Sequence, residues 1–202
     1  SADDGKPYET FFSADLTVTF AYEKAGQILY PGCELCGKVV IADIGITDES
    51  WLERKPTCFA LEPQDLKEIP KRPHRSNKGT FGRVLVIAGS TNMAGAALFC
   101  AQAAYEAGCG LVRVFTPETN RVILQSTLPE AILSTYACGQ EGSDLSKLLA
   151  DAIAWADVIA IGPGLSLSNR ALDILKTVFC DSNKPLVMDA DALNLLAKND
   201  VL

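Results

Sequence analysis

The sequence has little of what metal sites, membrane spans and nucleic-acid surfaces require. It contains one histidine, His74, and every apolar run is far shorter than the roughly 20 residues that cross a bilayer. A net charge of −7 and a pI of about 4.7 make nucleic acid and anionic lipid poor general partners. The start, Ser1 to Gly5, has neither the basic flank nor the apolar core of a signal peptide. We therefore expect a cytoplasmic protein that binds neither membrane nor nucleic acid.

The seven cysteines favour reduced thiols over a metal or disulfide framework. Four of them lie in apolar or small-residue stretches, where a thiol behaves as a small buried hydrophobe: Cys100, Cys109, Cys138 and Cys180. Cys33 and Cys36 form a C-x-x-C pair, whose spacing suits a metal or a redox couple. A structural zinc site usually needs a second pair, so we expect no metal site.

The first part of the chain predicts two strands. Residues 14–22 alternate apolar and polar side chains, and a second strand fits Lys38–Ile44. Two strands cannot bury both of their faces alone. From Asp48 to Asn77 the composition shifts to charge and proline, with one short helix predicted at Pro63–Ile69. This stretch is interpreted as a connector.

The remaining sequence alternates between strand and helix patterns. Short apolar runs, typical of strands covered on both faces, are Val84–Ala88, Leu111–Phe115, Ala131–Thr135, Val158–Ile161 and Leu186–Met188. Helical patterns fit Gly95–Gly108, Thr119–Ser126, Asp144–Trp155 and Asn169–Phe179. This alternation predicts an α/β fold with a doubly wound parallel sheet.

Ligands of such sheets bind beyond the carboxyl ends of the strands, and three of these ends are unusual. A small-residue loop, 89–97, follows the first strand and runs into a helix start, where free amides and the helix dipole favour an anion or a polar ligand. Gly162-Pro163-Gly164-Leu165 follows the fourth strand as a rigid turn. Asp189 to Asn194 brings two carboxylates and an amide to the end of the fifth.

Each of these segments also has a structural interpretation. The loop 89–97 fits tight helix–sheet packing as well as ligand binding, and it matches neither the P-loop nor the G-x-G-x-x-G fingerprint. Asp191 fits an N-cap for a helix that begins at Ala192. Lys78 to Gly82, ahead of the first strand, fits a cationic loop for phosphate or a flexible entry to the strand.

Several motifs occur in a fixed order along this second part: Lys78–Ser90, Gly95–Ala97, Gly108–Val112, Pro129-Glu130, Gly162–Leu165 and Asp189–Asn194. In order and spacing they resemble the ADP/ATP-dependent NAD(P)H-hydrate dehydratases, a ribokinase-like family. The upstream segments Ala14–Phe20, Lys24–Gly26, Pro31-Gly32 and Asp43–Ile46 resemble the closing strands of the NAD(P)H-hydrate epimerase domain. That domain precedes the dehydratase in bifunctional bacterial proteins.

The resemblance implies a domain arrangement. Residues 1–46 would be the C-terminal strands of a Rossmann-like epimerase domain, and residues 47–56 a connector. Residues 57–202 would be the N-terminal part of the dehydratase domain, the first half of a ribokinase-like doubly wound parallel sheet.

The activity that the resemblance implies is repair of hydrated nicotinamide cofactors, a form of metabolite repair by a multifunctional enzyme. The dehydratase, a lyase, removes water from the S hydrate of NADH or NADPH with ADP or ATP and Mg²⁺. The epimerase, an isomerase, interconverts the R and S hydrates and uses K⁺, whose ligands would lie outside this chain. The intact protein is expected to be a homo-oligomer.

The resemblance also implies site residues. Ala96 and Gly164 would contact the hydrated nicotinamide nucleotide. Their close neighbours in the site would be Gly95, Asn92, Gly162 and Asp189. The catalytic aspartate of the dehydratase would follow Asn194 and the epimerase site would precede Ser1, so no catalytic residue is assigned. We therefore expect the 202 residues to be inactive by themselves.

Two other functions fit parts of the sequence. A ribokinase-like kinase for a vitamin or sugar shares the sheet and also couples a nucleotide to a hydroxyl. A persistent phosphorylated product would identify it. A non-catalytic nucleotide-binding fragment would bind its ligand without turnover, even when the downstream segment is supplied.

Overall fold

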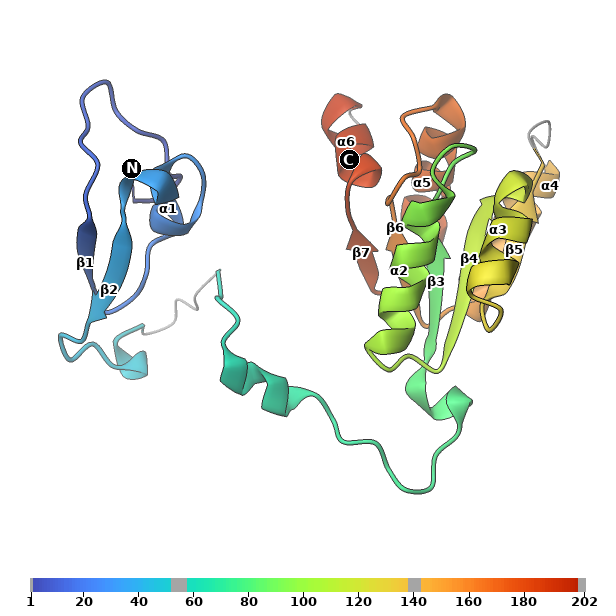
Figure 1. The fold of residues 1–202 in the computed structure, drawn as a ribbon, viewed down its shortest axis with the longest axis horizontal. Helices are drawn as coiled ribbons and strands as arrows, with labels where there is room; N and C mark the ends of the chain where they lie inside the picture. The colour runs from blue at the N-terminus through green and yellow to red at the C-terminus, as the bar shows by residue number, and fades with distance from the viewer. Residues whose placement is uncertain (1, 52–57, 138–142, 200–202) are drawn as a thin grey trace. The chain divides into compact units, whose positions relative to one another are not determined.

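The computed structural model describes residues 2–51, 58–137 and 143–199. The chain forms two compact units, Ser1–Lys71 and Arg72–Leu202, which are described separately (Figure 1). This division follows the contacts of the chain. The assignment of 1–46, 47–56 and 57–202 to parts of two enzyme domains stays a prediction.

The first unit contains both predicted strands. β1 (Leu16–Phe20) and β2 (Lys38–Ala42) pair in parallel, with Leu16 opposite Lys38. Between them lie the short helix α1 (Ala25–Ile28) and the 3₁₀ helix η1 (Gly32–Leu35), which the sequence did not predict. Leu16, Val18 and Phe20 are more than half exposed, as expected of two strands that cannot cover both faces.

The connector forms two 3₁₀ turns within the described residues. These are η2 (Asp48–Trp51) and η3 (Pro63–Glu68). The short helix expected at Pro63–Ile69 is therefore a 3₁₀ helix rather than an α-helix. Pro63 lies in its first turn, where a missing amide hydrogen removes no helical hydrogen bond.

The second unit is built on a parallel sheet of five strands, which confirms the doubly wound α/β prediction. The strands are β3 (Arg83–Ile87), β4 (Leu111–Pro117), β5 (Ile132–Tyr136), β6 (Val158–Ile161) and β7 (Leu186–Met188). Their order across the sheet is β5-β4-β3-β6-β7, and every pair is parallel.

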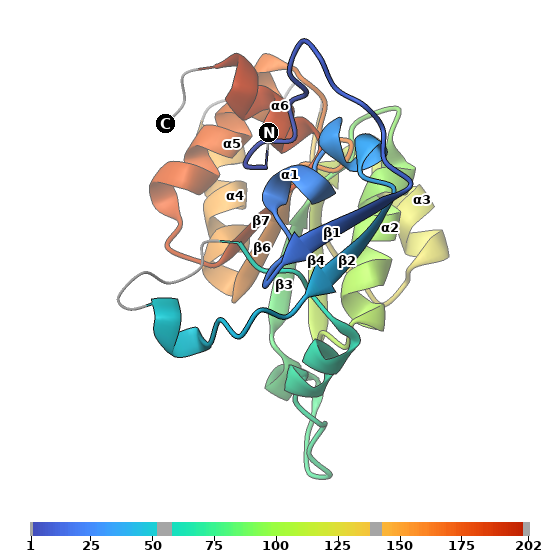
Figure 2. The same cartoon turned by 90° about the vertical axis from the view of Figure 1, so that its left-hand side faces the viewer.

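Helices cover both faces of this sheet. They are α2 (Ala94–Glu106), α3 (Arg121–Thr127), α4 (Ser143–Trp155), α5 (Asn169–Asp181) and α6 (Asp191–Lys198). α2 and α3 pack on one face, and α4, α5 and α6 pack on the other, so the strands lie between two helical layers (Figure 1; Figure 2). The 3₁₀ helices η4 (Lys78–Phe81) and η5 (Glu118–Asn120) precede β3 and α3.

Both faces of β3 are buried, which explains why the strand sequences are continuously apolar. Leu85 and Ile87 are fully buried against the α4–α6 layer, whereas Val86 and Ala88 are fully buried against the α2–α3 layer. Burying each of the larger side chains contributes about 1.5 to 3 kcal/mol. The two cores together hold the strand ends, and the loops that follow them, in place.

The described thiols differ in one respect from expectation. Cys100 and Cys109 are partly buried, but Cys180 is exposed, and Cys138 lies outside the described residues. The buried face of α5 is formed by Ala171, Ile174, Leu175 and Val178. Because Cys180 lies off this face, the expectation that it is buried was wrong.

Candidate functional site

The strand order places a topological switch point at the carboxyl ends of β3 and β6. Counted along this unit, the strands run 3-2-1-4-5 across the sheet. The chain leaves β3 toward one helical layer and β6 toward the other, so the loops after these strands diverge and leave a crevice. The loops 89–93 and 162–168 flank this point.

The loop after β3 begins with a glycine that packing requires. Gly89 has a φ of +80°, and a Cβ atom there would lie 3.0 Å from both Ala97 Cβ and Thr116 Oγ1. Gly95, in the first turn of α2, is different because a Cβ atom there would have nothing within 4 Å. The space beside Gly95 is therefore open.

Several amides at this edge are available to a ligand. Those of Asn92, Gly95 and Gly164 have no backbone partner among the described residues. Asn92 and Gly95 are exposed, and both lie at the start of α2, where the helix dipole favours negative charge or a polar acceptor. These features match the ligand interpretation of the loop 89–97.

The loop after β6 touches the loop after β3 directly. Gly164 has a φ of +62°, and a Cβ atom there would lie 2.7 Å from Ala96 Cβ. The Gly89 amide donates a hydrogen bond to the Pro163 carbonyl at 2.8 Å. The structure thus brings together Ala96 and Gly164, the two residues that the resemblance implies as contacts of the hydrated nucleotide.

The loop after β7 braces the same edge. A Cβ atom on Gly162 would lie 1.9 Å from the Asp189 carbonyl oxygen, so this buried glycine is required by packing. The Asp191 carboxylate accepts a hydrogen bond from the Ser166 amide at 2.8 Å. Asp191 is the first residue of α6 and Ala190 is its N-cap, so the N-cap interpretation of Asp191 was wrong.

Asp189 is exposed at this edge, and its charge reaches α2. Burial raises the pKa of the Cys100 thiol, and the negative charge of Asp189 raises it further. A thiol with a raised pKa stays protonated near neutral pH and is a weak nucleophile. Cys100 is therefore a packing residue beside the site.

One cavity of this unit lies at the carboxyl edge. It has a volume of about 430 Å³ and is lined by Ser90, Thr91, Pro117, Tyr136, Leu165, Ser166, Ser168, Asn169, Arg170 and Ala171. Its walls come from the loops after β3 and β6, the ends of β4 and β5, and the start of α5. Hydroxyl groups and one guanidinium make this cavity suitable for a polar ligand with phosphate groups.

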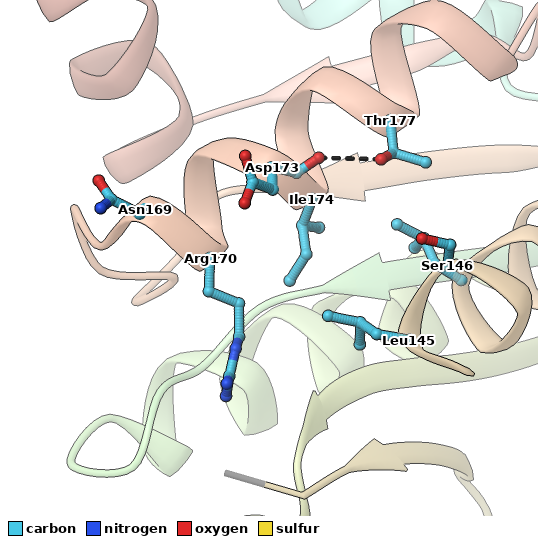
Figure 3. A pocket seen from close by; sticks show the side chains of 8 residues that line it. Leu145, Ser146, Asn169, Arg170, Asp173, Ile174 and Thr177 are labelled. Carbon is cyan, nitrogen blue, oxygen red and sulfur yellow. Dashed lines mark hydrogen bonds between the residues drawn. The ribbon is translucent and has the colours of Figure 1, made fainter. Parts of the chain in front are cut away.

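Another cavity, of about 450 Å³, lies between α4 and α5. Figure 3 shows Leu145 and Ile174 pointing toward each other there, and the Thr177 hydroxyl hydrogen-bonded to the Asp173 carbonyl at 2.9 Å. Asn169 and Arg170 line both cavities. Because it lies on the helical layer rather than at the strand ends, we do not assign the site to it.

The loop Lys78 to Gly82 does not contribute to this site. It precedes β3 and lies at the amino edge of the sheet, opposite the switch point. A Cβ atom on Gly110 would lie 1.7 Å from the Lys78 carbonyl oxygen, so this segment packs against the start of β4. Over residues 2–51, 58–137 and 143–199, no group of three or more His, Cys, Asp or Glu side chains gathers as a metal site.

Sequence reasoning missed one buried polar pair beside the site. Asn120 and Thr116 are both fully buried at the end of β4. The Asn120 amide nitrogen donates to the Ser90 carbonyl at 3.2 Å and contacts the Thr116 hydroxyl at 2.8 Å. A contact between residues 30 positions apart has no local sequence pattern, so only the fold shows it.

A family model described as NAD(P)H-hydrate dehydratase matches residues 84–201. The chain belongs to this family. The matched residues comprise β3 to β7 and the helices between them, and thus the whole candidate site. None of the described helices in this dehydratase-family chain is long and apolar enough to span a membrane.

Individual relatives agree with the family. The chain is 36% identical over 204 residues to the bifunctional NAD(P)H-hydrate repair enzyme Nnr of Moorella thermoacetica, covering 97% of this chain and 38% of that protein. The chain thus spans well under half of the length of this relative.

Solved structures also resemble the chain. A ribokinase-like superfamily protein from Enterococcus faecalis matches with a TM-score of 0.62 and 34% identity, over 69% of this chain and 48% of that one. The ADP/ATP-dependent NAD(P)H-hydrate dehydratase of Bacillus subtilis, co-crystallised with ATP/Mg²⁺, matches with a TM-score of 0.50 and 34% identity, over 61% and 42%. The ribokinase-like fold predicted from the motifs is therefore confirmed.

Proposed function

We propose that the protein repairs hydrated nicotinamide cofactors by converting the S hydrates of NADH and NADPH back to NADH and NADPH. One observation carries this proposal: the dehydratase family match, over residues 84–201, falls on the unit whose switch-point loops form the candidate site. The name of the Moorella relative supports repair of both cofactors.

The proposed co-substrate is ADP or ATP with Mg²⁺. The Bacillus neighbour, which is ADP/ATP-dependent and was crystallised with ATP/Mg²⁺, supports this choice. No three acidic or other metal-binding side chains gather within the described part of the chain, so we assign Mg²⁺ to none of these residues. When bound, the nucleotide would supply the phosphoryl group that makes the hydrate's hydroxyl a leaving group.

The residues of this chain would bind and orient the hydrated nucleotide. Ala96 and Gly164 would form the contact surface, since the methyl group of alanine and the absence of a side chain in glycine let a ligand approach the backbone. The free amides of Asn92 and Gly95 would donate hydrogen bonds to the ligand. Gly162 would shape the turn beside it, and the exposed Asp189 would face polar ligand groups.

Such binding has a direct catalytic consequence. Phosphoryl transfer depends mainly on positioning and on charge stabilisation rather than on covalent chemistry by the protein. A preorganised edge that holds the hydrate in one orientation therefore contributes to the rate. The catalytic base is not assigned to any residue of this chain.

The proposal also covers the first unit and the whole protein. Residues 1–46 would complete an epimerase domain that interconverts R and S hydrates and uses K⁺, with 47–56 as connector and 57–202 as the start of the dehydratase domain. The Moorella relative, which is bifunctional, supports this arrangement. We further propose a cytoplasmic homo-oligomer without membrane or nucleic-acid partners.

The test is recovery of the NADH absorbance from S-NADH hydrate in the presence of ADP or ATP. The enzyme would be residues 1–202 together with the segments that complete the length of its relatives, and the matched control would carry Gly164→Val, which fills the contact with Ala96. We expect nucleotide-dependent recovery that the control lacks. A phosphorylated small molecule that accumulates without dehydration, or binding of NADPH without turnover, would contradict the proposal.

A further inference from the structure

Asn120 lies beside the candidate site without lining it. It ends η5, directly after the end of β4, and its side chain is fully buried. Its amide nitrogen donates to the Ser90 carbonyl, and Ser90 lines the cavity at the carboxyl edge. Asn120 therefore connects the end of β4 to the loop that follows the neighbouring strand β3.

The surroundings leave this loop little freedom at its first residue. A Cβ atom on Gly89 would lie 3.1 Å from the Asn120 amide nitrogen and 3.0 Å from Thr116 Oγ1. The Ser90 carbonyl also accepts a hydrogen bond from the Met93 amide at 3.0 Å. The Ser90 carbonyl thus accepts one hydrogen bond from within the loop, from Met93, and one from outside it, from Asn120.

The Asn120 side chain is not explained by packing alone. Its Oδ1 atom is buried and has no hydrogen-bond partner among the described residues. A buried, unsatisfied acceptor costs about 1 to 3 kcal/mol, a cost that an apolar side chain would avoid. The donated hydrogen bond to Ser90 is therefore the feature that an asparagine supplies at this position.

We propose that Asn120 is a positioning residue that, together with Thr116, holds the loop 89–93 in the conformation that binds the hydrated nucleotide. The identity of the ligand rests on the proposed function, whereas the holding of the loop does not. Asn120 acts through Ser90 and does not itself touch the ligand.

The test measures hydrogen exchange of backbone amides in the 202-residue chain. The reporters are the amides of Gly89 and Met93, which are bonded to Pro163 and Ser90, with the Val114 amide of the core strand β4 as reference. Asn120→Asp keeps the shape of the side chain, and its ionised carboxylate only accepts hydrogen bonds, so the exchange is measured above the pKa of this carboxyl group. We expect both reporters to exchange roughly 2- to 13-fold faster relative to Val114, the effect of losing one hydrogen bond.

Control variants separate positioning from general loss of stability. Thr116→Val removes the hydroxyl that Asn120 contacts, so the loop amides should exchange faster. Thr116→Ser keeps the hydroxyl and should leave their exchange rates unchanged. Leu124→Val loosens the core cluster between the sheet and the α2–α3 layer, which includes Val114, without removing a hydrogen bond, so it should change the exchange rates of the loop amides and of the reference amide alike. If Asn120→Asp changes the exchange rates of the loop amides and of Val114 by the same factor, as expected for Leu124→Val, the inference is overturned.

A second readout is the affinity for NADPH, the stable product, measured with the same variants. Asn120→Asp and Thr116→Val should weaken binding, and Thr116→Ser and Leu124→Val should not. If the unaltered chain binds no NADPH, the proposed ligand is wrong, while the exchange result still decides whether Asn120 holds the loop. If NADPH binds equally well to all variants, the positioning role is refuted.

Discussion

Gly164 allows a quantitative test of the contact at the centre of the candidate site. Its φ of +62° lies in the left-handed region, where a residue with a side chain costs about 1 to 2 kcal/mol. A Cβ atom there would also lie 2.7 Å from Ala96 Cβ, closer than two carbon atoms can pack. Relieving that overlap should cost about 1 to 3 kcal/mol.

Gly164→Ala should therefore lower the free energy of unfolding by about 2 to 5 kcal/mol, the sum of the two effects. Ala96→Gly alone should cost at most about 1 kcal/mol, the helix penalty of glycine. In the double variant the overlap with Ala96 disappears, whereas the contact with Met93 Cβ at 3.0 Å, the conformational cost and the helix penalty of glycine remain. The two substitutions should thus show a coupling of about 1 to 3 kcal/mol, with Ala96→Gly rescuing part of the loss.

Gly82→Ala is the matched control for backbone strain. Gly82 also has a positive φ, of 75°, but a Cβ atom there would meet nothing closer than Asp157 Oδ2 at 3.8 Å. Ala96→Gly should not rescue this variant, because no overlap with Ala96 exists.

Urea unfolding followed by circular dichroism measures all of these free energies. Additive effects of Gly164→Ala and Ala96→Gly would refute the reasoning, since the two loops would then not be in contact. NADPH binding provides the functional readout on the same proteins. We expect weaker binding by Gly164→Ala and partial recovery in the double variant.

Three further predictions concern neighbouring residues. Gly95→Ala should raise the free energy of unfolding by about 0.5 to 1 kcal/mol, because alanine suits a helix better and the space is open, yet it should weaken NADPH binding; unchanged binding would argue against a ligand there. Asp191→Ala should cost about 1.5 to 3 kcal/mol in urea unfolding, the value of a hydrogen bond to a charged group, whereas Asp191→Asn should cost less; equal losses would contradict this. Hydrogen bonds from Arg83 lower the pKa of Asp157, so this carboxylate stabilises the fold above its unfolded pKa, and that contribution is lost as the pH falls through the lowered value. In Asp157→Asn the free energy of unfolding, measured in urea at several pH values, should therefore fall less steeply at acid pH. An unchanged pH dependence would refute this prediction.

The strands of the second unit were predictable because both of their faces are covered. Continuous apolar runs such as 84–88, short and bounded by turn residues, are typical of strands buried on both faces, and their ends mark the carboxyl edge of the sheet. The helix α5 was also recognisable, but the burial of Cys180 was misjudged because its apolar neighbourhood along the sequence is not its neighbourhood in space.

Small residues at the site were ambiguous in the sequence, and the structure separates them. Gly162 is needed because the Asp189 carbonyl leaves no room for a side chain, and Gly89 is favoured by its positive φ and by side-chain atoms 3.0 Å from where a Cβ would lie. Gly95 faces open space, so packing does not explain its lack of a side chain. The sequence pattern could not make this distinction, since it records the size of a residue but not the space around it.

The long-range hydrogen bonds at the carboxyl edge could not be predicted, yet they form one chain across it. Asn120 donates to Ser90, the Gly89 amide donates to Pro163, and the Ser166 amide donates to Asp191.

Each bond joins the loop after one strand to the loop after the next strand across the sheet, from β4 through β3 and β6 to β7. Loops tied in this way cannot move independently, which suits a reaction that depends on positioning. The polar pair at the end of β4 and the carboxylate after β7 thus hold the connected loops from opposite ends of the edge.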